Sequence, residues 1–406
     1  MAFFHMLNPT KPYLSINYFL TFSLNPNYLL VFRLRLTPTF FLSLLLAISS
    51  CTEKFYPEVD EDVSILVVDG KITDETSPCE VRLFRTVKFT DDFPFRPETG
   101  AMVVLYNDLG ETEVLNEVEP GIYQSSFTTI KGEIGRTYWI EIQTLSGETY
   151  ESTPELMHSA YEISSLYGEE IEVITDNNSK EEAVGIYFDA RNNEKTGTYL
   201  RWEYRESYEW HAPFTITTKF SDNPTTICYP VNDYPLINVY DASKLANNEA
   251  NHLLTSKILQ HEVKLEHNYL LDMRLYSVSQ ENYIFWKNMK TIHQSNGNLY
   301  DILPANIRGN ISSCENNCEV LGYFEASSVR TKKAIFSKEE FTVDFSDFPE
   351  ECETFKIKLD VGRPDPSKYY VLREYEEGRI TVYVVIRLHC LECNLKYPVK
   401  KPSFWP

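Results

Sequence analysis

The chain has 406 residues and a formal net charge of −21 at pH 7, with 59 acidic and 38 basic side chains. A surface this acidic repels phosphate backbones, which argues against nucleic acid as a partner. The length allows about two domains, each large enough to bury a core of its own.

The segment that ends at Cys51 has the organisation of a secretory signal. Arg33 and Arg35 flank the start of a short apolar run at 36–48, and two small residues directly precede the cysteine. This arrangement resembles the lipobox of bacterial lipoproteins, in which the cysteine becomes the lipid-modified first residue. A transmembrane anchor is the alternative, but the run is shorter than the about 20 apolar residues that span a bilayer. We therefore expect residues 1–50 to be a signal peptide and Cys51 to carry a covalent lipid.

Residues 1–30 are surplus to that signal, because signal peptides are about 15–30 residues long. We infer that translation begins later, around Leu30 to Leu34, and that residues 1–30 are a mis-assigned extension. A second signal is disfavoured, since Asn25-Pro26-Asn27 ends the apolar run at 18–24.

Residues 51–62 are predicted to form an acidic tether, with Glu58, Asp60, Glu61 and Asp62 close together. One interpretation is a solvated spacer that holds the first domain off the membrane. The other is a surface-export signal, because acidic residues soon after a lipidated cysteine resemble such signals in Bacteroidota lipoproteins. Composition alone favours neither interpretation.

Residues 63–155 alternate apolar and polar side chains with a period of two, which predicts short β-strands. Turn-forming pairs such as Asp69-Gly70 and Ser146-Gly147 separate the runs. Seven such strands predict an immunoglobulin-like β-sandwich. Tyr138 fits either a corner tyrosine or a plain core tyrosine, and the core role is favoured. The expected strands are 63–68, 81–86, 101–106, 112–118, 122–127, 137–143 and 148–152.

After a linker at 154–159, residues 160–406 predict a larger β-rich domain with one notable α-helix, so the predicted fold is mostly β. In the run 199–208, Leu200, Trp202 and Tyr204 face one way and the intervening charged residues face the other. The expected strands are 184–189, 199–208, 215–220, 236–240, 263–265, 270–278, 341–345, 355–359 and 381–388.

The helix is predicted from its start signal and its apolar stripe. Ser277-Val278-Ser279-Gln280 has the spacing of a capping box. Phe285, Met289 and Ile292 then recur at helical spacing, and we expect this stripe to face the core.

Seven cysteines follow Cys51, and in an exported chain the default expectation is disulfides. Zinc is the alternative, with Cys314 and Cys318 as one pair and Cys390 and Cys393 as the other. The first pair has one residue too many for a zinc ribbon, and about 70 residues separate the pairs where about 15–20 are usual. An odd count leaves one thiol unpaired, and Cys79, in a strand-like run, is expected to be that buried thiol.

Motifs for catalysis are missing from the sequence. It contains no Gly-x-Ser-x-Gly elbow, no phosphate-binding glycine loop and no dinucleotide fingerprint. His261 and His267 have a spacing that places both on one strand face, but strand histidines are more often solvated than metal-bound. The pairs Glu169-Glu170 and Glu376-Glu377 would diverge on a strand. We therefore expect that the protein is not an enzyme. The alternative is a hydrolase whose two catalytic carboxylates are brought together only by the fold.

Aromatic residues are concentrated around one predicted strand, at Trp202, Tyr204, Tyr208 and Trp210. Exposed, they would offer stacking faces for a sugar or a peptide. Buried, they would form part of a β-sheet core, and this interpretation is favoured.

Several short motifs follow one another in a fixed order along the chain. They are the lipobox, Val68-Asp69-Gly70-Lys71-Ile72-Thr73, Gly135-x-Thr137-Tyr138, Tyr283-x-x-Trp286, Gly309-Asn310-Ile311, Leu321-Gly322-Tyr323-Phe324-x-Ala326-Ser327-Ser328, Cys390-x-x-Cys393 and Lys401-Pro402-x-Phe404-Trp405. Together they resemble the Bacteroidota lipoprotein family catalogued as domain of unknown function 4249, over nearly all of the chain after Cys51.

The resemblance implies an outer-membrane or cell-surface lipoprotein associated with a TonB-dependent receptor, and no known catalytic residue. Cys314 and Cys318 are not part of the family pattern, so we expect a local disulfide between them. Cys352 is expected to pair with Cys390 or Cys393.

We therefore expect a non-enzymatic lipoprotein, anchored in the outer membrane by the lipid on Cys51 and needing no other cofactor. Its expected role is an accessory or ligand-capture subunit of a nutrient-uptake receptor barrel. A stand-alone surface adhesin or glycan-binding module is the alternative, motivated by the aromatic strands.

Overall fold

The computed structural model describes residues 64–87, 95–126, 128–175, 178–194, 199–214, 225–233, 236–245, 247–294, 307–314, 319–346 and 348–405. The predicted signal peptide and tether, Cys51, Cys318 and the expected strand 215–220 lie outside these ranges, so each stays a prediction. Within the described ranges, no helix is long and apolar enough to cross a membrane. The chain is mostly β, as its periodicity predicts.

Two sheets pack face to face around the first hydrophobic core. Leu66 and Val68 of one sheet meet Leu105 and Ile140 of the other, and all four side chains are buried. Inward-facing residues of both sheets thus interdigitate, as in a β-sandwich. The strands of this region are β1 (Leu66–Thr73), β2 (Glu80–Thr86), β3 (Phe95–Pro97), β4 (Met102–Asn107), β5 (Thr112–Val114), β6 (Asn116–Glu119), β7 (Ile122–Gln124), β8 (Thr137–Gln143), β9 (Thr149–Ser152) and β10 (Glu155–Leu156).

Tyr138 is a corner tyrosine, although the sequence favours the plain core role. Its hydroxyl donates to the carbonyl oxygen of Lys131 at 2.8 Å and accepts from the backbone N–H of Glu133 at 2.8 Å. The residue is almost fully buried. A buried phenol needs partners for its O–H and its lone pairs, and the upstream backbone supplies both.

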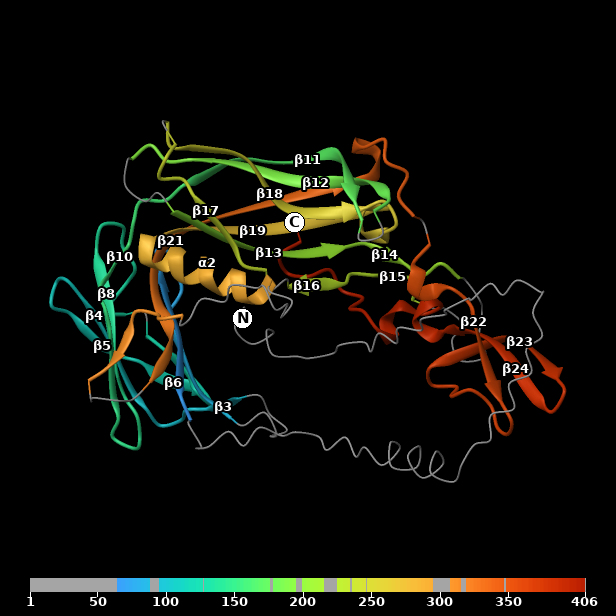
Figure 1. Ribbon diagram of the computed structural model, residues 1–406, viewed down its shortest axis with the longest axis horizontal. Coiled ribbons are helices and arrows are strands. Elements are labelled where there is room, and N and C mark those ends of the chain that lie inside the picture. Colours follow the sequence, from blue (N-terminus) through green and yellow to red (C-terminus); the bar gives the residue numbers. More distant parts are fainter. Residues whose placement is uncertain are drawn as a thin grey trace, which may run out of the picture. The chain divides into compact units, whose positions relative to one another are not determined.

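Strand β21 (Val320–Ser337) connects the two predicted domains. Its first half pairs in parallel with β1, and its second half pairs antiparallel with β19 (Asn268–Val278). In Figure 1 the orange β21 runs beside the blue β1. The division into 63–155 and 160–406 stays a prediction about domains, but one sheet runs through both ranges.

The expected turn at Asp69-Gly70 is wrong, because β1 continues to Thr73. Gly70 allows close packing there. A Cβ atom at this position would lie 2.8 Å from Cδ2 of Phe324, whose ring fills the sandwich core. The glycine is therefore explained by its neighbour on β21 and not by a turn.

The large sheet has the order β16-β13-β19-β21-β1-β2-β7-β6, with β17 paired to β13 and β3 to β2. A second core lies between it and the three-stranded sheet β11-β12-β18, where Phe188 meets Trp202. The strands added here are β11 (Glu162–Ile174), β12 (Lys180–Arg191), β13 (Tyr199–Tyr208), β14 (Trp210–His211), β15 (Ile227–Cys228), β16 (Val231–Asp233), β17 (Asn238–Asp241), β18 (Glu249–Leu259) and β20 (Ile311–Ser313), which extends the second sheet of the sandwich beside β9.

Helix α2 (Gln280–Gln294) follows β19 directly and lies along β13 and β17 (Figure 1). Its cap is Ser279, whose Oγ accepts the backbone N–H of Asn282 at 3.1 Å, and not Ser277, which belongs to β19. Phe285 is buried as expected and Met289 packs against the same cluster, whereas Ile292 is 40% exposed.

Within the described ranges, two expected strands are not formed. Val263–Leu265 is a 3-10 helix, η2, and 341–345 is irregular. Val343 and Phe345 are nevertheless buried in the second core. Alternate burial without a pairing partner produces the same sequence pattern as a strand, which explains the error at 341–345.

The chain ends in a three-stranded sheet of order β22-β24-β23. These strands are β22 (Phe355–Leu359), β23 (Tyr369–Glu377) and β24 (Ile380–Arg387), and the short 3-10 helices near them are η3 (Lys338–Glu340), η4 (Glu350–Cys352), η5 (Leu388–Cys390) and η6 (Cys393–Leu395). Beyond it, Phe404 and Trp405 pack on Leu270 of β19.

Candidate functional site

One face of the large sheet carries charges of alternating sign. The strand register places Arg205 opposite Asp272 and Glu203 opposite Arg274. Side chains alternate between the two faces along a strand, so these charged residues share one face while their neighbours fill the core. β21 and β1 continue the row of charges, because Lys71 lies opposite Glu325. The alternation seen in 199–208 thus becomes a charged surface once four strands are aligned.

Arg201 lies buried at the centre of this face. Its Nη2 donates to Oε1 of Glu325 at 3.0 Å, and its Nη1 lies 3.5 Å from Oε2 of Glu203. The guanidinium carbon is 4.2 Å from the ring centroid of Tyr276 and 5.1 Å from that of Trp286. A planar guanidinium can be paired and stacked at once, which a lysine cannot match.

Lys71 and Tyr276 complete what we call the cavity cluster, which is Lys71, Arg201, Glu203, Tyr276 and Glu325. The ammonium of Lys71 donates to the hydroxyl of Tyr276 at 3.4 Å, and that hydroxyl donates to Glu203. Helix α2 contributes Asn282, whose amide donates to the second oxygen of Glu325 at 3.1 Å. Strands from both ends of the chain and the helix thus meet at one polar centre.

The charges of the cavity cluster are mutually stabilised. Burial alone would raise the pKa of Glu203, but Lys71 and Arg201, with the hydrogen bond from Tyr276, lower that pKa to about 2. Burial raises the pKa of Tyr276 to about 12. The pKa of Lys71 is raised because the attraction of Glu203 and other neighbours outweighs its burial. The carboxylate and the ammonium are therefore both charged at neutral pH.

A cavity of about 470 Å³ opens onto this face. Its volume is within the range of about 300–1,000 Å³ that is usual for small-molecule sites. The lining holds five cationic and four acidic residues, in a chain where acids greatly outnumber bases. These lining residues are Lys71, Arg82, Arg201, Arg205, Arg274, Glu80, Glu203, Asp233 and Asp272.

The predicted site cysteines lie elsewhere in the molecule. Cys352 pairs with Cys390, and Cys393 pairs with Cys228, a partner that the sequence did not suggest. Both cysteines of the Cys390-x-x-Cys393 motif therefore form long-range disulfides. The buried free thiol of Cys79 is confirmed, and burial raises its pKa.

Cys314, expected in a disulfide with Cys318, is a free and exposed cysteine. It directly follows β20, and its backbone N–H donates to the carbonyl oxygen of Thr149 at 3.0 Å. The backbone thus continues the pairing of β20 with β9 at this point, and an exposed thiol needs no partner to be accommodated. Cys318 lies outside the described residues.

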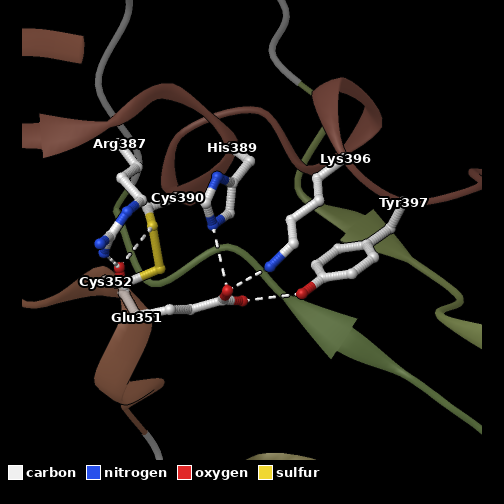
Figure 2. The surroundings of a disulfide bond; sticks show 7 residues. All are labelled: Glu351, Cys352, Arg387, His389, Cys390, Lys396 and Tyr397. Atoms are coloured by element: carbon white, nitrogen blue, oxygen red, sulfur yellow. Dashed lines mark hydrogen bonds and ion pairs between the residues drawn. A yellow bond between two sulfur atoms is a disulfide. The ribbon is translucent and has the colours of Figure 1, made fainter. Parts of the chain in front are cut away.

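The Cys352–Cys390 disulfide is surrounded by polar side chains that we call the Glu351 cluster, which is Glu351, His389, Lys396 and Tyr397. Figure 2 shows the carboxylate of Glu351 between the other three. Tyr397 donates to Oε1 at 2.7 Å, Lys396 donates to Oε2, and Nε2 of His389 lies 3.5 Å from Oε2. His389, Lys396 and Tyr397 together outweigh burial and lower the pKa of Glu351 to about 2.

One possible metal group exists among the described residues, formed by Cys352, His389 and Cys390. Two of its three ligand atoms are the sulfurs of the disulfide, which leaves no thiolate to coordinate a metal. The group therefore belongs to the crosslink.

Other candidates from the sequence are separated by the fold. His261 lies beside Glu181, and the ring of His267 lies against that of His211, with ring centroids 3.7 Å apart and the planes tilted by 31°. The two histidines flank a 3-10 helix and do not share a strand face.

The aromatic residues around β13 belong to the core. The exposed fraction is below a tenth for each of Trp202, Tyr204, Tyr208 and Trp210. The favoured interpretation of these residues, a sheet core, is confirmed.

The cavity cluster is not predicted from the sequence, although the sequence carries one signal for it. Three of the segments that carry the family resemblance meet here, since Lys71, Trp286 and Glu325 come from β1, α2 and β21. When family motifs lie far apart in the sequence, one explanation is that the fold brings them together at a common site.

Comparison with protein-family models gives a match over residues 52–333. A comparison with curated proteins finds no match. The matched range contains every residue of the cavity cluster and ends before the Glu351 cluster. The chain belongs to the family described as Domain of unknown function (DUF4249).

Proposed function

We propose that this protein is a lipid-anchored, non-enzymatic ligand-capture subunit of a TonB-dependent nutrient-uptake receptor at the outer membrane. The observation that carries the capture role is the charged cavity of about 470 Å³ on the large sheet. The anchor on Cys51 and the receptor partner rest on the lipobox and on the family resemblance.

The composition of the cavity supports binding over a purely structural role. Desolvating charges is costly, and replacing a buried ion pair by apolar side chains is often neutral or stabilising. If this sheet face served stability alone, apolar side chains would stabilise it as well as the buried pair of Arg201 and Glu325 does. The charged pair beside an open cavity therefore favours a binding role. Strands and a helix hold these side chains, so the site is pre-organised for a ligand.

The alternative, a stand-alone adhesin or glycan-binding module, was motivated by stacking faces on the aromatic strand residues. Those rings are buried, so the alternative loses the observation that favoured it.

Affinity purification tests the proposed partnership. A tagged full chain is recovered from detergent-solubilised outer membrane, and the co-purifying proteins are identified by mass spectrometry. We expect a receptor barrel with the lipidated chain and its loss with Cys51→Ala. Recovery of the lipidated chain without any barrel would overturn the proposal.

A further inference from the structure

We propose that the charged cavity binds a small organic anion through its carboxylate group, with Lys71 as the direct cationic contact. This inference rests on the proposed capture function and names the chemistry of the captured ligand. It follows from a count of the hydrogen-bond donors and acceptors in the cavity wall.

The acidic residues of the wall are largely occupied by protein donors. Glu80 accepts from Arg82 at 2.8 Å and from Gln124 at 2.7 Å. Asp272 accepts from two nitrogens of Arg205, at 2.9 and 2.8 Å. Glu203 lies 3.5 Å from Arg201 and accepts from Tyr276, so three of the four lining carboxylates are paired within the protein.

Two donors of the wall are left over. Nε1 of Trp286 and Nε of Arg201 are buried and have no acceptor among the described residues. The exposed fractions of these two residues are 8% and 6%. An unpaired buried N–H is costly, and its partial positive charge acts strongly in a medium of low polarity. The wall thus presents a positive potential to the cavity.

Lys71 is placed to contact a ligand in this potential. It is half-buried, lines both the main cavity and the smaller one beside it, and makes one hydrogen bond within the described residues, to Tyr276. An ammonium has three N–H donors, so two remain for a ligand. A ligand carboxylate supplies acceptor oxygens for these remaining N–H donors, and its negative charge strengthens the hydrogen bonds.

Isothermal titration calorimetry on the purified full chain tests the inference with two matched pairs of probes. These are D-glucuronate against D-glucose and succinate against succinamide. We expect at least one anion to bind saturably at millimolar concentration and its neutral partner to bind roughly tenfold more weakly, the usual effect of losing a charged hydrogen bond.

Variants locate the binding. Lys71→Gln should weaken the anion roughly tenfold, whereas Lys358→Gln, at an exposed lysine of β22 paired with Glu377, should leave it unchanged. Because Lys71→Gln also perturbs the cavity cluster, Trp286→Phe provides a milder test. It keeps most of the ring, removes the unpaired N–H and should weaken binding about threefold.

Three results would overturn the inference. They are no binding of either anion, equal binding of a neutral partner, or unchanged anion binding by folded Lys71→Gln and Trp286→Phe. A receptor barrel recovered without anion binding would reject this inference alone. Anion binding without a barrel would reject the proposed partnership alone.

Discussion

The cavity cluster and the Glu351 cluster differ in how their charged groups are buried and paired. In the first, Arg201 and Glu325 are buried beside an open volume, and N–H groups of the wall have no acceptor. In the second, one carboxylate accepts from Lys396 and Tyr397 and lies 3.5 Å from Nε2 of His389, next to a disulfide (Figure 2). The two clusters therefore differ in the burial of their ion pairs and in the size of the cavity beside them, about 470 Å³ at the first and about 270 Å³ beside His389.

The cavity cluster should be the more sensitive of the two to the loss of one charge. Arg201→Met leaves Glu325 without its main cation and removes one of the two cations that act on Glu203. We expect a loss of roughly 3–5 kcal/mol in the free energy of unfolding. Urea denaturation measures it. Arg363→Met, at an exposed ion pair with Glu374, is the matched control and should change stability by less than about 1 kcal/mol. Equal effects of the two substitutions would erase the distinction between buried and exposed pairs.

The covalent link should stabilise the chain without affecting the cavity. Cys352 and Cys390 are 38 residues apart, and their joint replacement by serine should cost about 4 kcal/mol. Anion binding by the folded double variant should stay unchanged. Cys314→Ser, at the exposed free thiol, should be neutral for both measurements. A loss of binding in the double variant would show that the two clusters are not independent.

A buried acid beside the cavity cluster should respond to pH in the direction opposite to Glu351. Burial raises the pKa of Glu155 to about 7, although Tyr323 donates to it. The folded state then holds a proton that the unfolded state loses near pH 4.5, so this contribution to stability is lost as pH rises from about 4.5 to 7. Relative to wild type, Glu155→Gln should be more stable at pH 8 than at pH 4 by roughly 3 kcal/mol. Denaturation curves of both proteins at both pH values measure this difference. If the difference is absent, the pKa of Glu155 is not raised in the folded state.

Glu351 should contribute stability at neutral pH that is lost in acid. Its pKa is lowered to about 2 in the folded state, so the contribution is present above about pH 4.5 and lost as pH falls toward 2. Since the side chain is 30% exposed, screening reduces the expected cost of Glu351→Gln to about 2 kcal/mol at pH 7. The cost should vanish near pH 2. Thermal melts at the two pH values measure it, and a cost independent of pH would assign the effect to shape and not to charge.

Much of the local structure is predictable from the sequence. β13 has the bounds that its alternation predicts, and the long helix forms where a start signal precedes an apolar stripe. The errors occur where tertiary contacts imitate or override a local signal. Gly70 was expected in a turn but lies within a strand, where it leaves room for Phe324. Residues 341–345 were expected to form a strand, because Val343 and Phe345 are buried in the second core.

The site depends on pairings that no local pattern encodes. Alternation along β13 shows that Arg201 and Glu203 share a face, but not which strands lie beside them. The parallel pairing of β1 with β21 brings Lys71 next to Glu325 across most of the chain, and Cys228 meets Cys393 in the same long-range manner. The sequence by itself determined many of the strands, the helix and the buried thiol, because these follow from side-chain periodicity over a few residues. Only the tertiary structure decided the cavity, its spare donors and the disulfide partners, because each requires residues that are distant in sequence to meet in one register.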